Sequence, residues 1–311
     1  MTIAIGMLCR EGAVICADSL VTTGTIGSYE SKMLAYRIDG ADVVFALAGN
    51  VDLAESAWQQ CEPALMRHAG KKTTTRQIAA SLRSILAKEY RGQVIDCGYV
   101  NTQYDYAFII SIRVGRTVEL YHTYSKTLKK SRRGREFIGA GGDLAKMLFQ
   151  WLDYMPLSAE RAGEICASFV GTLKRLMLGV VGGNNLIMLL GEDGEIVFYR
   201  DADLRLIEQY SPIYEAESSV LLSSFIDGSV KTEEFEKAVE RFVGQVRFWR
   251  KELKTKRDQI VFSTPPVEAE HAIIDLRKKP PAAWSRATKS STAHSRSVTL
   301  QTDPPPRSGA V

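Results

Sequence analysis

Apolar and polar residues alternate over short stretches of this chain, and tight turns separate those stretches, which predicts β-hairpins. Strand-like runs at 2–9 and 13–21 flank the turn Arg10-Glu11-Gly12, a hairpin signal. The same pattern predicts further strands at 33–38, 42–48, 105–114, 117–122, 135–139, 185–190 and 195–200. Because such short turns join antiparallel neighbours, we expect largely antiparallel sheets.

Apolar residues spaced three and four positions apart predict helices between the strand blocks. These helices are expected at 51–68, 75–91, 142–153 and 158–177. Strand blocks separated by helix pairs favour two stacked sheets with helices on the outside, and they exclude the simplest doubly wound architecture. The expected fold class is therefore α+β.

A change of composition near residue 210 divides the chain. We expect a globular domain over residues 1–210, a helical extension over 211–260 and a disordered tail over 261–311. The extension contains one charged amphipathic helix at 232–257, whose Phe and Trp stripe is typical of a docking face, on the body or on a neighbouring subunit. The tail is rich in Pro, Ser, Lys and Arg and has too few apolar residues to offset the entropy of ordering.

The net charge of the whole chain, +4, comes from its C-terminal region. Residues 250–311 hold 12 Lys and Arg against 6 Asp and Glu, so residues 1–249 carry a net charge of −2. Nucleic-acid binding needs a basic face on the folded body, so we expect no nucleic-acid partner. No apolar run approaches the roughly 20 residues that span a bilayer. The N-terminus lacks a signal-peptide pattern, so we expect no membrane partner and a cytoplasmic location.

Cysteine and histidine are too scattered to predict a metal site or a disulfide framework. The five cysteines contain no C-x-x-C pair, and the four histidines have no metal-ligand spacing. An odd, dispersed set of cysteines argues against disulfides and against structural zinc, so we expect no metal and no cofactor. Cys9, Cys16 and Cys166 lie in apolar runs and are expected in the core.

The candidate chemistry lies at the N-terminus. A threonine hydroxyl is a weak nucleophile that needs a base. Once Met1 is removed, Thr2 carries a free α-amine beside its own hydroxyl. The pKa of such an amine is ordinarily about 7.7–8.0, so the amine is mostly protonated at neutral pH. The ammonium of Lys32 would lower that pKa, and Asp18 would hold Lys32 in place and keep it charged.

The register of the first hairpin decides whether these residues share a face of the sheet. With a three-residue loop and Gly12 at its left-handed position, Ala4 pairs with Asp18. Cross-strand partners point to the same side, so Thr2 and Asp18 then share a face. A loop one residue longer or shorter would place them on opposite faces.

The order and spacing of several short motifs resemble those of a known protein family. They are Thr2, Gly6, Glu11-Gly12, Ala17-Asp18-Ser19, Thr23-Gly24 and Lys32, followed by glycine motifs at 46–50, 137–142 and 182–183. This spacing resembles that of proteasome β-type subunits and their bacterial relatives. Those relatives include the peptidase subunit of a two-component ATP-dependent protease and the ancestral-β-like proteins. The resemblance covers roughly residues 2–200.

The resemblance implies a four-layer αββα sandwich of the N-terminal-nucleophile (Ntn) hydrolase type, assembled into a ring or related homo-oligomer. It implies a threonine-type peptidase or amidohydrolase that acts on peptide or unfolded-protein substrates, with an ATPase or other regulatory partner. Residue by residue, Thr2 matches the nucleophile, Asp18 the acidic partner and Lys32 the amine-tuning lysine. Ala46 or its neighbours would supply the backbone N–H that stabilises the oxyanion, a donor worth about 2.7–4 kcal/mol.

Three positions depart from the family pattern. The family has Ser where this chain has Ala140, Asp where it has Leu178, and Ser where it has Val181. In the family, those polar groups orient the amine and its proton path. Their loss supports a second hypothesis, a non-catalytic assembly or scaffold protein on the same fold.

Two stretches suggest anion binding instead. The glycines of 139–142 precede a helix, and amides at a helix start suit phosphate. This stretch lacks the third glycine of a dinucleotide-binding fingerprint. The basic run at 126–135 is typical of a solvated loop, with anion binding as the alternative.

Overall fold

A computed structural model describes residues 3–23, 26–29, 31–100, 105–150, 157–199, 201–227, 229–257 and 273–278. The chain divides into two compact units, Met1–Leu276 and Arg277–Val311, and the fold described below is that of the first. Among the described helices, none is both long enough and apolar enough to cross a bilayer.

Two β-sheets form the centre of the first unit. The first sheet has the strand order β10-β1-β2-β11-β12 and the second β13-β5-β6-β7-β8-β9. The strands of the first sheet are β1 (Ile3–Cys9), β2 (Gly12–Asp18), β10 (Arg135–Gly139), β11 (Asn185–Gly191) and β12 (Ile196–Phe198). Those of the second are β5 (Met33–Ile38), β6 (Ala41–Gly49), β7 (Tyr106–Val114), β8 (Thr117–Tyr124), β9 (Thr127–Lys130) and β13 (Ile273–Asp275). A separate hairpin pairs β3 (Leu20–Thr23) with β4 (Ile26–Tyr29).

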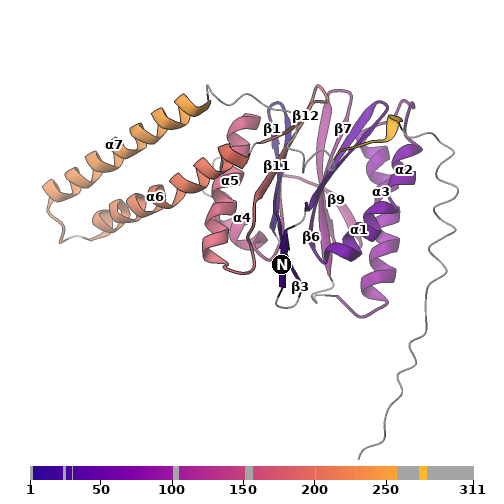
Figure 1. Ribbon diagram of the computed structural model, residues 1–311, viewed down its shortest axis with the longest axis horizontal. Coiled ribbons are helices and arrows are strands. Elements are labelled where there is room, and N and C mark those ends of the chain that lie inside the picture. Colours follow the sequence, from indigo (N-terminus) through magenta and orange to yellow (C-terminus); the bar gives the residue numbers. More distant parts are fainter. Residues whose placement is uncertain are drawn as a thin grey trace, which may run out of the picture. The chain divides into compact units, whose positions relative to one another are not determined.

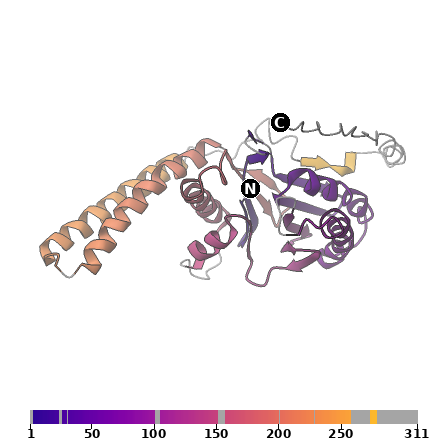
Figure 2. The ribbon, with the colours of Figure 1, turned by 90° about the horizontal axis from the view of Figure 1, so that it is seen from below.

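Helices cover the outer face of each sheet (Figure 1). Against the second sheet lie α1 (Val51–Gln59), α2 (Glu62–Met66) and α3 (Thr75–Tyr90), the last continued by a π-helical turn at Arg91–Ile95. Against the first sheet lie α4 (Gly142–Gln150) and α5 (Ala159–Leu176). The predicted four-layer αββα sandwich is therefore confirmed. Two further helices, α6 (Asp201–Ile226) and α7 (Thr232–Arg257), lie side by side in both views (Figures 1 and 2).

The side chains of β1 alternate between two hydrophobic cores, because successive residues of a strand point to opposite faces. Ala4 belongs to the core between the two sheets. Ile3, Ile5 and Met7 belong to the core between the first sheet and the helices α4 and α5. A sheet covered on both faces needs apolar residues at consecutive positions, which is why β1 and β2 are nearly continuous apolar runs.

The structure differs from the sequence-based expectation in the C-terminal third. Helix α6 was not expected, and the boundary expected at residue 210 falls inside it. Within the tail expected to be disordered, residues 273–278 are ordered as β13 and a short 3-10 turn. Strand β13 pairs in parallel with β5 and thereby becomes the edge strand of the second sheet. Its residues Ile273 and Ile274 are β-branched, a type that favours strands. The helix expected at 51–68 is broken into α1 and α2.

The first hairpin has a tighter turn than predicted. Cys9 pairs with Gly12 and Ala4 with Ala17, so the loop contains two residues and the expected pairing of Ala4 with Asp18 is wrong. Because the loop is one residue shorter than expected, the register no longer supports the expectation that Thr2 and Asp18 share a face of the sheet. Gly12 makes this turn possible, because its φ of +153° is one that L side chains rarely adopt. A Cβ at that position would lie 2.0 Å from the carbonyl oxygen of Leu190 on the neighbouring strand.

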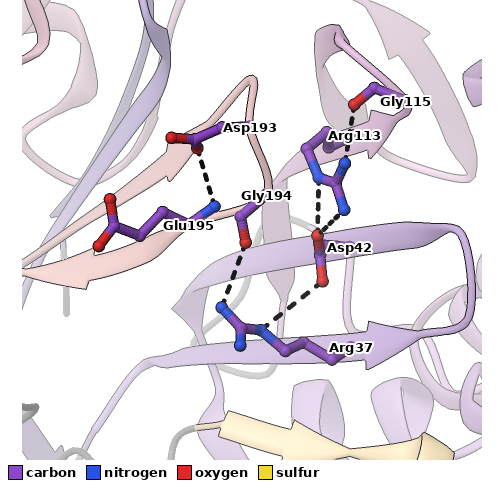
Figure 3. Close-up of polar contacts among 7 residues, drawn as sticks. All are labelled: Arg37, Asp42, Arg113, Gly115, Asp193, Gly194 and Glu195. Carbon is purple, nitrogen blue, oxygen red and sulfur yellow. Dashed lines mark hydrogen bonds and ion pairs between the residues drawn. The ribbon is translucent and has the colours of Figure 1, made fainter.

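A polar cluster joins the two sheets at the end of the sandwich away from Asp18 (Figure 3). The buried carboxylate of Asp42 accepts a hydrogen bond from Nε of Arg113 at 2.7 Å and lies 3.8 Å from Nε of Arg37. Arg37 also donates to the carbonyl oxygen of Gly194, in the turn between β11 and β12, at 3.2 Å. Because Arg37 belongs to the second sheet and Gly194 to a turn of the first, this contact ties the sheets together.

Substitution of Gly12 by alanine is expected to destabilise the protein by about 3 kcal/mol, because a backbone carbonyl in a packed sheet cannot move aside for the new Cβ. Gly40→Ala is the matched control. Gly40 has φ +86°, and a Cβ there would meet nothing within 4 Å, so the strain of the left-handed backbone alone, about 1–2 kcal/mol, is expected. Urea unfolding of both variants measures the difference, and equal costs would contradict the proposed clash.

Thiol labelling of the native protein is expected to modify Cys97 and to spare the other cysteines. Cys97 is exposed, whereas Cys16, Cys61 and Cys166 are buried. Burial raises the pKa of the half-buried Cys9 to about 11, so its reactive thiolate is scarce at neutral pH. Titration with a disulfide reagent at pH 7.5 should count one fast thiol, and Cys97→Ser should remove it. A second fast thiol would contradict this prediction.

Candidate functional site

The site predicted at the N-terminus centres on a buried ion pair between Asp18, the last residue of β2, and Lys32, directly before β5. Nζ of Lys32 donates to Oδ1 of Asp18 at 3.1 Å, and both side chains are 0% exposed. Nζ also donates to the carbonyl oxygen of Leu20. The pair spans the two sheets, since Asp18 ends a strand of the first and Lys32 precedes an edge-side strand of the second.

Backbone N–H groups complete the coordination of the Asp18 carboxylate. The N–H of Ile3 donates to Oδ1 at 3.1 Å, and the N–H of Gly182 donates to Oδ2 at 3.0 Å. Removing a carboxylate from water is costly unless its lone pairs are satisfied, and each hydrogen bond to a charged group contributes about 1.5–3 kcal/mol. These two amides and the ammonium are what allow a charged group at this depth.

A loop after α5, residues 182–184, holds Asp18 and the residues after it, and sequence analysis did not assign it this role. The N–H groups of Ser19 and Leu20 donate to the carbonyls of Asn184 and Gly182, each at 3.1 Å. In return the N–H of Asn184 donates to Oγ of Ser19 at 2.8 Å. The paired glycines were the only signal of this loop in the sequence. Its contact with Asp18 spans 164 residues and follows from the tertiary fold.

Thr2, the predicted nucleophile, lies outside the described residues. Its chain neighbour Ile3 is described, and Ile3 is the residue whose N–H binds Asp18. The site therefore brings together Asp18, Lys32 and the backbone of the residue that directly follows Thr2 in the sequence.

Ala46, the predicted oxyanion donor, lies inside β6, where it pairs with Met33 of β5 and Ile109 of β7. The N–H of Leu47 donates to the carbonyl of Lys32 at 3.0 Å, on the β5 side. N–H groups of adjacent residues in a strand point to opposite edges, so the N–H of Ala46 is directed at β7, within the sheet.

Gly49 lies at the end of β6, two residues after Leu47 and directly before Asn50, whose N–H donates to Asp105 on the β7 side. By the same alternation, we infer that the N–H of Gly49 is directed to the opposite side, that of Leu47. Gly49 has φ +101°, and a Cβ there would lie 2.2 Å from the carbonyl oxygen of Asp105, so only glycine fits. Its N–H faces the Lys32 side of the strand end, past the start of β5 at Met33.

The three residues that depart from the family pattern, Ala140, Leu178 and Val181, give the Asp18–Lys32 pair no polar side chain. Val181 is buried at 2% exposure and contributes to the core under α5. Leu178 is 83% exposed, and Ala140 is also exposed. Around the Asp18 carboxylate, the described hydrogen-bond donors are therefore Lys32 and backbone amides.

A pocket of about 340 Å³ opens beside Lys32, between the second sheet and the helices α1 and α2. The volume is within the range of small-ligand sites, about 300–1,000 Å³. Burial, followed by the charge of Glu62, raises the pKa of Tyr36, one of the lining residues, so that this phenol stays neutral. The apolar walls are formed by Met33, Leu34, Phe45, Leu47, Trp58, Phe108 and Ile274, and two carboxylates, Glu55 and Glu62, also line it.

Comparison with known proteins identifies the fold. Neither a protein-family model nor a curated protein matches the sequence. Solved structures of Anbu, the ancestral β-subunit, do match the fold. A mutant Anbu from Hyphomicrobium sp. strain MC1 is 16% identical, with a TM-score of 0.58 over 73% of this chain and 97% of its own. Anbu from Yersinia bercovieri is 14% identical, with a TM-score of 0.56 over 72% and 97%. The helical assembly of the Anbu complex from Pseudomonas aeruginosa is 17% identical, with a TM-score of 0.54 over 71% of this chain and 95% of its own.

The chain has the Anbu-type fold. The resemblance to proteasome β-type subunits is thereby corrected, because these structural neighbours belong to a proteasome-like but distinct group, the Anbu proteins. At 14–17% identity the similarity establishes the proteasome-like Ntn fold and not the activity. The roles of individual residues must therefore come from the site itself.

The structure offers no described metal-binding cluster to compete with this site. Within the described ranges, no group of three or more His, Cys, Asp or Glu side chains comes together in a geometry that could hold a metal ion.

Replacing Lys32 by methionine is expected to destabilise the protein by about 3–5 kcal/mol, because it leaves the Asp18 carboxylate buried without its cation. The double variant Asp18→Asn/Lys32→Met removes both charges and should recover a large part of that loss. Urea unfolding of the wild type, both single variants and the double variant completes the cycle. Costs that simply add would contradict a direct interaction between the two buried charges.

Proposed function

We propose that this protein is a threonine-type hydrolase of amide bonds, with Thr2 as its nucleophile after removal of Met1. One observation carries the proposal: a buried Lys32–Asp18 pair whose carboxylate binds the N–H of Ile3 at 3.1 Å. Ile3 directly follows Thr2, so the charged pair is anchored to the backbone one residue beyond the proposed nucleophile.

The energetics of the pair support a functional role. A buried ion pair is often no more stabilising than apolar residues of the same volume, because both charges lose their hydration. A fold that needed only packing at this position would be served by such residues. Buried charges held by a specific partner are found more often at functional sites than elsewhere.

In the proposed mechanism, Oγ of Thr2 attacks the substrate carbonyl while the neutral α-amine of Thr2 takes the hydroxyl proton. The amine then donates that proton to the departing nitrogen, which leaves an ester between the substrate acyl group and Oγ. A water molecule, deprotonated by the same amine, hydrolyses the ester and restores the hydroxyl. The positive charge of Lys32 favours the neutral amine that these steps require.

We assign the oxyanion-stabilising N–H to Gly49 rather than to Ala46. The ladder directs the N–H of Ala46 toward β7, whereas that of Gly49 faces the Lys32 side of the strand end. A backbone donor on a rigid strand needs no reorganisation during the reaction, which is what makes such donors effective. The apolar pocket beside Lys32 would hold a substrate side chain.

Assembly of this chain into a homo-oligomer belongs to the same proposal. It is supported by the helical assembly formed by Anbu from Pseudomonas aeruginosa, whose fold this chain shares. We extend the proposal to peptide or unfolded-protein substrates and to an ATPase or other regulatory partner because the fold is proteasome-like.

A peptide epoxyketone tests the proposal, because this electrophile forms a stable ring only with a hydroxyl and a free α-amine on the same residue. Intact-mass measurement should show loss of Met1 and gain of one inhibitor per chain. Thr2→Ala should abolish both the adduct and peptide hydrolysis, while Thr2→Ser, which keeps a hydroxyl and an amine, should retain the adduct. Unchanged hydrolysis by Thr2→Ala would eliminate the proposal.

The second candidate is a non-catalytic scaffold, favoured by the apolar residues Ala140, Leu178 and Val181 at positions that are polar in the resembled family. If Met1 is retained, the nitrogen of Thr2 stays in a peptide bond and cannot act as a base. That result would support the scaffold hypothesis. In that case neither the wild type nor Thr2→Ser would acquire the inhibitor.

A further inference from the structure

A second, larger pocket lies on the lateral edge of the sandwich and shares no lining residue with the pocket beside Lys32. Its volume is about 980 Å³. Seven arginine and lysine side chains line it, and they are Arg83, Lys129, Lys130, Arg132, Arg133, Arg135 and Lys146. The remaining lining residues are His122, Thr127, Leu128, Glu136, Phe137 and Phe149.

All four layers of the fold contribute to this basic pocket. Arg83 comes from α3 and Lys146 from α4, the two outer layers. Strand β9 is the edge strand of the second sheet and β10 that of the first, and the chain crosses between them at residues 131–134. The basic run at 126–135 thus forms β9, the loop that crosses between the sheets and the start of β10, and several of its exposed side chains also line this pocket.

Among the described residues, three carboxylates lie against the seven cations of the pocket. Glu136 is the one carboxylate among its described lining residues, and its Oε2 lies 3.1 Å from Nδ1 of His122. Lys130 pairs with Glu119, and Lys146 with the exposed Asp143, a kind of surface pair that contributes little.

Arg132 and Arg133, in the loop that crosses between the sheets, are the residues best placed to bind a ligand. Arg132 and Arg133 are exposed, and neither forms an ion pair with any described residue. Clustering like charges is unfavourable in the free protein, so an arrangement of this kind is consistent with a bound anion that neutralises it. The guanidinium group also has the planar fork that matches phosphate oxygens.

One wall of the pocket is apolar and aromatic. Phe137 is half-buried and packs on the buried Phe149 with ring centroids 4.8 Å apart, and the buried Leu128 also lines the pocket. The volume is at the upper end of small-ligand sites, about 300–1,000 Å³. A cavity of this size, with seven cations and an aromatic wall, suits a small anion that carries several phosphates and an aromatic group.

We propose that this basic pocket binds an oligophosphate of the nucleoside triphosphate class, with its phosphates on Arg132, Arg133 and the neighbouring lysines. The half-buried ring of Phe137 would contact its base. A nucleic acid is disfavoured because the cations line a cavity, whereas backbone recognition needs an extended basic stripe. The proposal does not rest on Thr2 chemistry, so each can fail without the other.

Isothermal titration calorimetry on the full chain tests it, with ATP, sodium tripolyphosphate and adenosine as separate ligands at matched ionic strength. We expect ATP to bind more tightly than tripolyphosphate, and adenosine not to bind detectably. The double variant Arg132→Gln/Arg133→Gln should lower the affinity for ATP on the order of tenfold or more, because charge-assisted hydrogen bonds are lost.

Arg247→Gln/Arg250→Gln is the matched control, because it removes the same charge from exposed positions on α7. This control variant should bind ATP as tightly as the wild type does. If both double variants lost the same amount of ATP affinity, ATP would be attracted by net charge alone and the proposed binding site would be wrong. Absence of ATP and tripolyphosphate binding, or tighter binding of an RNA duplex than of ATP, would also overturn it. Binding of tripolyphosphate as tightly as ATP would keep the phosphate site and overturn the nucleotide assignment.

Discussion

The buried ion pair between Asp18 and Lys32 is the constraint around which the candidate site is built. Two charges at 0% exposure are tolerated only where hydrogen bonds replace the water they lose. Here the replacement comes from the backbone of Ile3, Leu20 and Gly182, which belong to segments far apart in the sequence. The sandwich must therefore bring these segments together before the pair can form.

The layered fold meets that requirement because strands of both sheets end at the same place. Strand β2 ends at Asp18, and β5 begins just after Lys32. The loop at 182–184 arrives there because α5 covers the outer face of the first sheet and leads into β11, which pairs with β2. At the opposite end, Asp42 and its two arginines tie the sheets together without any role at the site.

The Anbu structures clarify what is shared and what is additional. They are matched over 95–97% of their own length, while 71–73% of this chain takes part. The catalytic proposal draws on the shared fold and on residues near its N-terminus. The basic pocket lies within the sandwich but on its lateral edge, where β9, β10 and the loop between them meet α3 and α4. Two separate regions of one fold thus carry two independent proposals, hydrolysis at the N-terminal site and anion binding at the basic pocket.

Local patterns in the sequence determined most of the element types, because two-residue and 3.6-residue periodicities follow directly from strand and helix geometry. They also singled out Asp18 and Lys32 as a pair. They did not determine the register of the first hairpin, which depends on Gly12 fitting against Leu190 on another strand. Nor did they reveal that Gly182 binds Asp18, that Ile273 and Ile274 complete a sheet edge, or that residues of the basic run line a pocket together with α3 and α4. Each of these depends on contacts between residues distant in sequence, and only the tertiary structure brings such residues together.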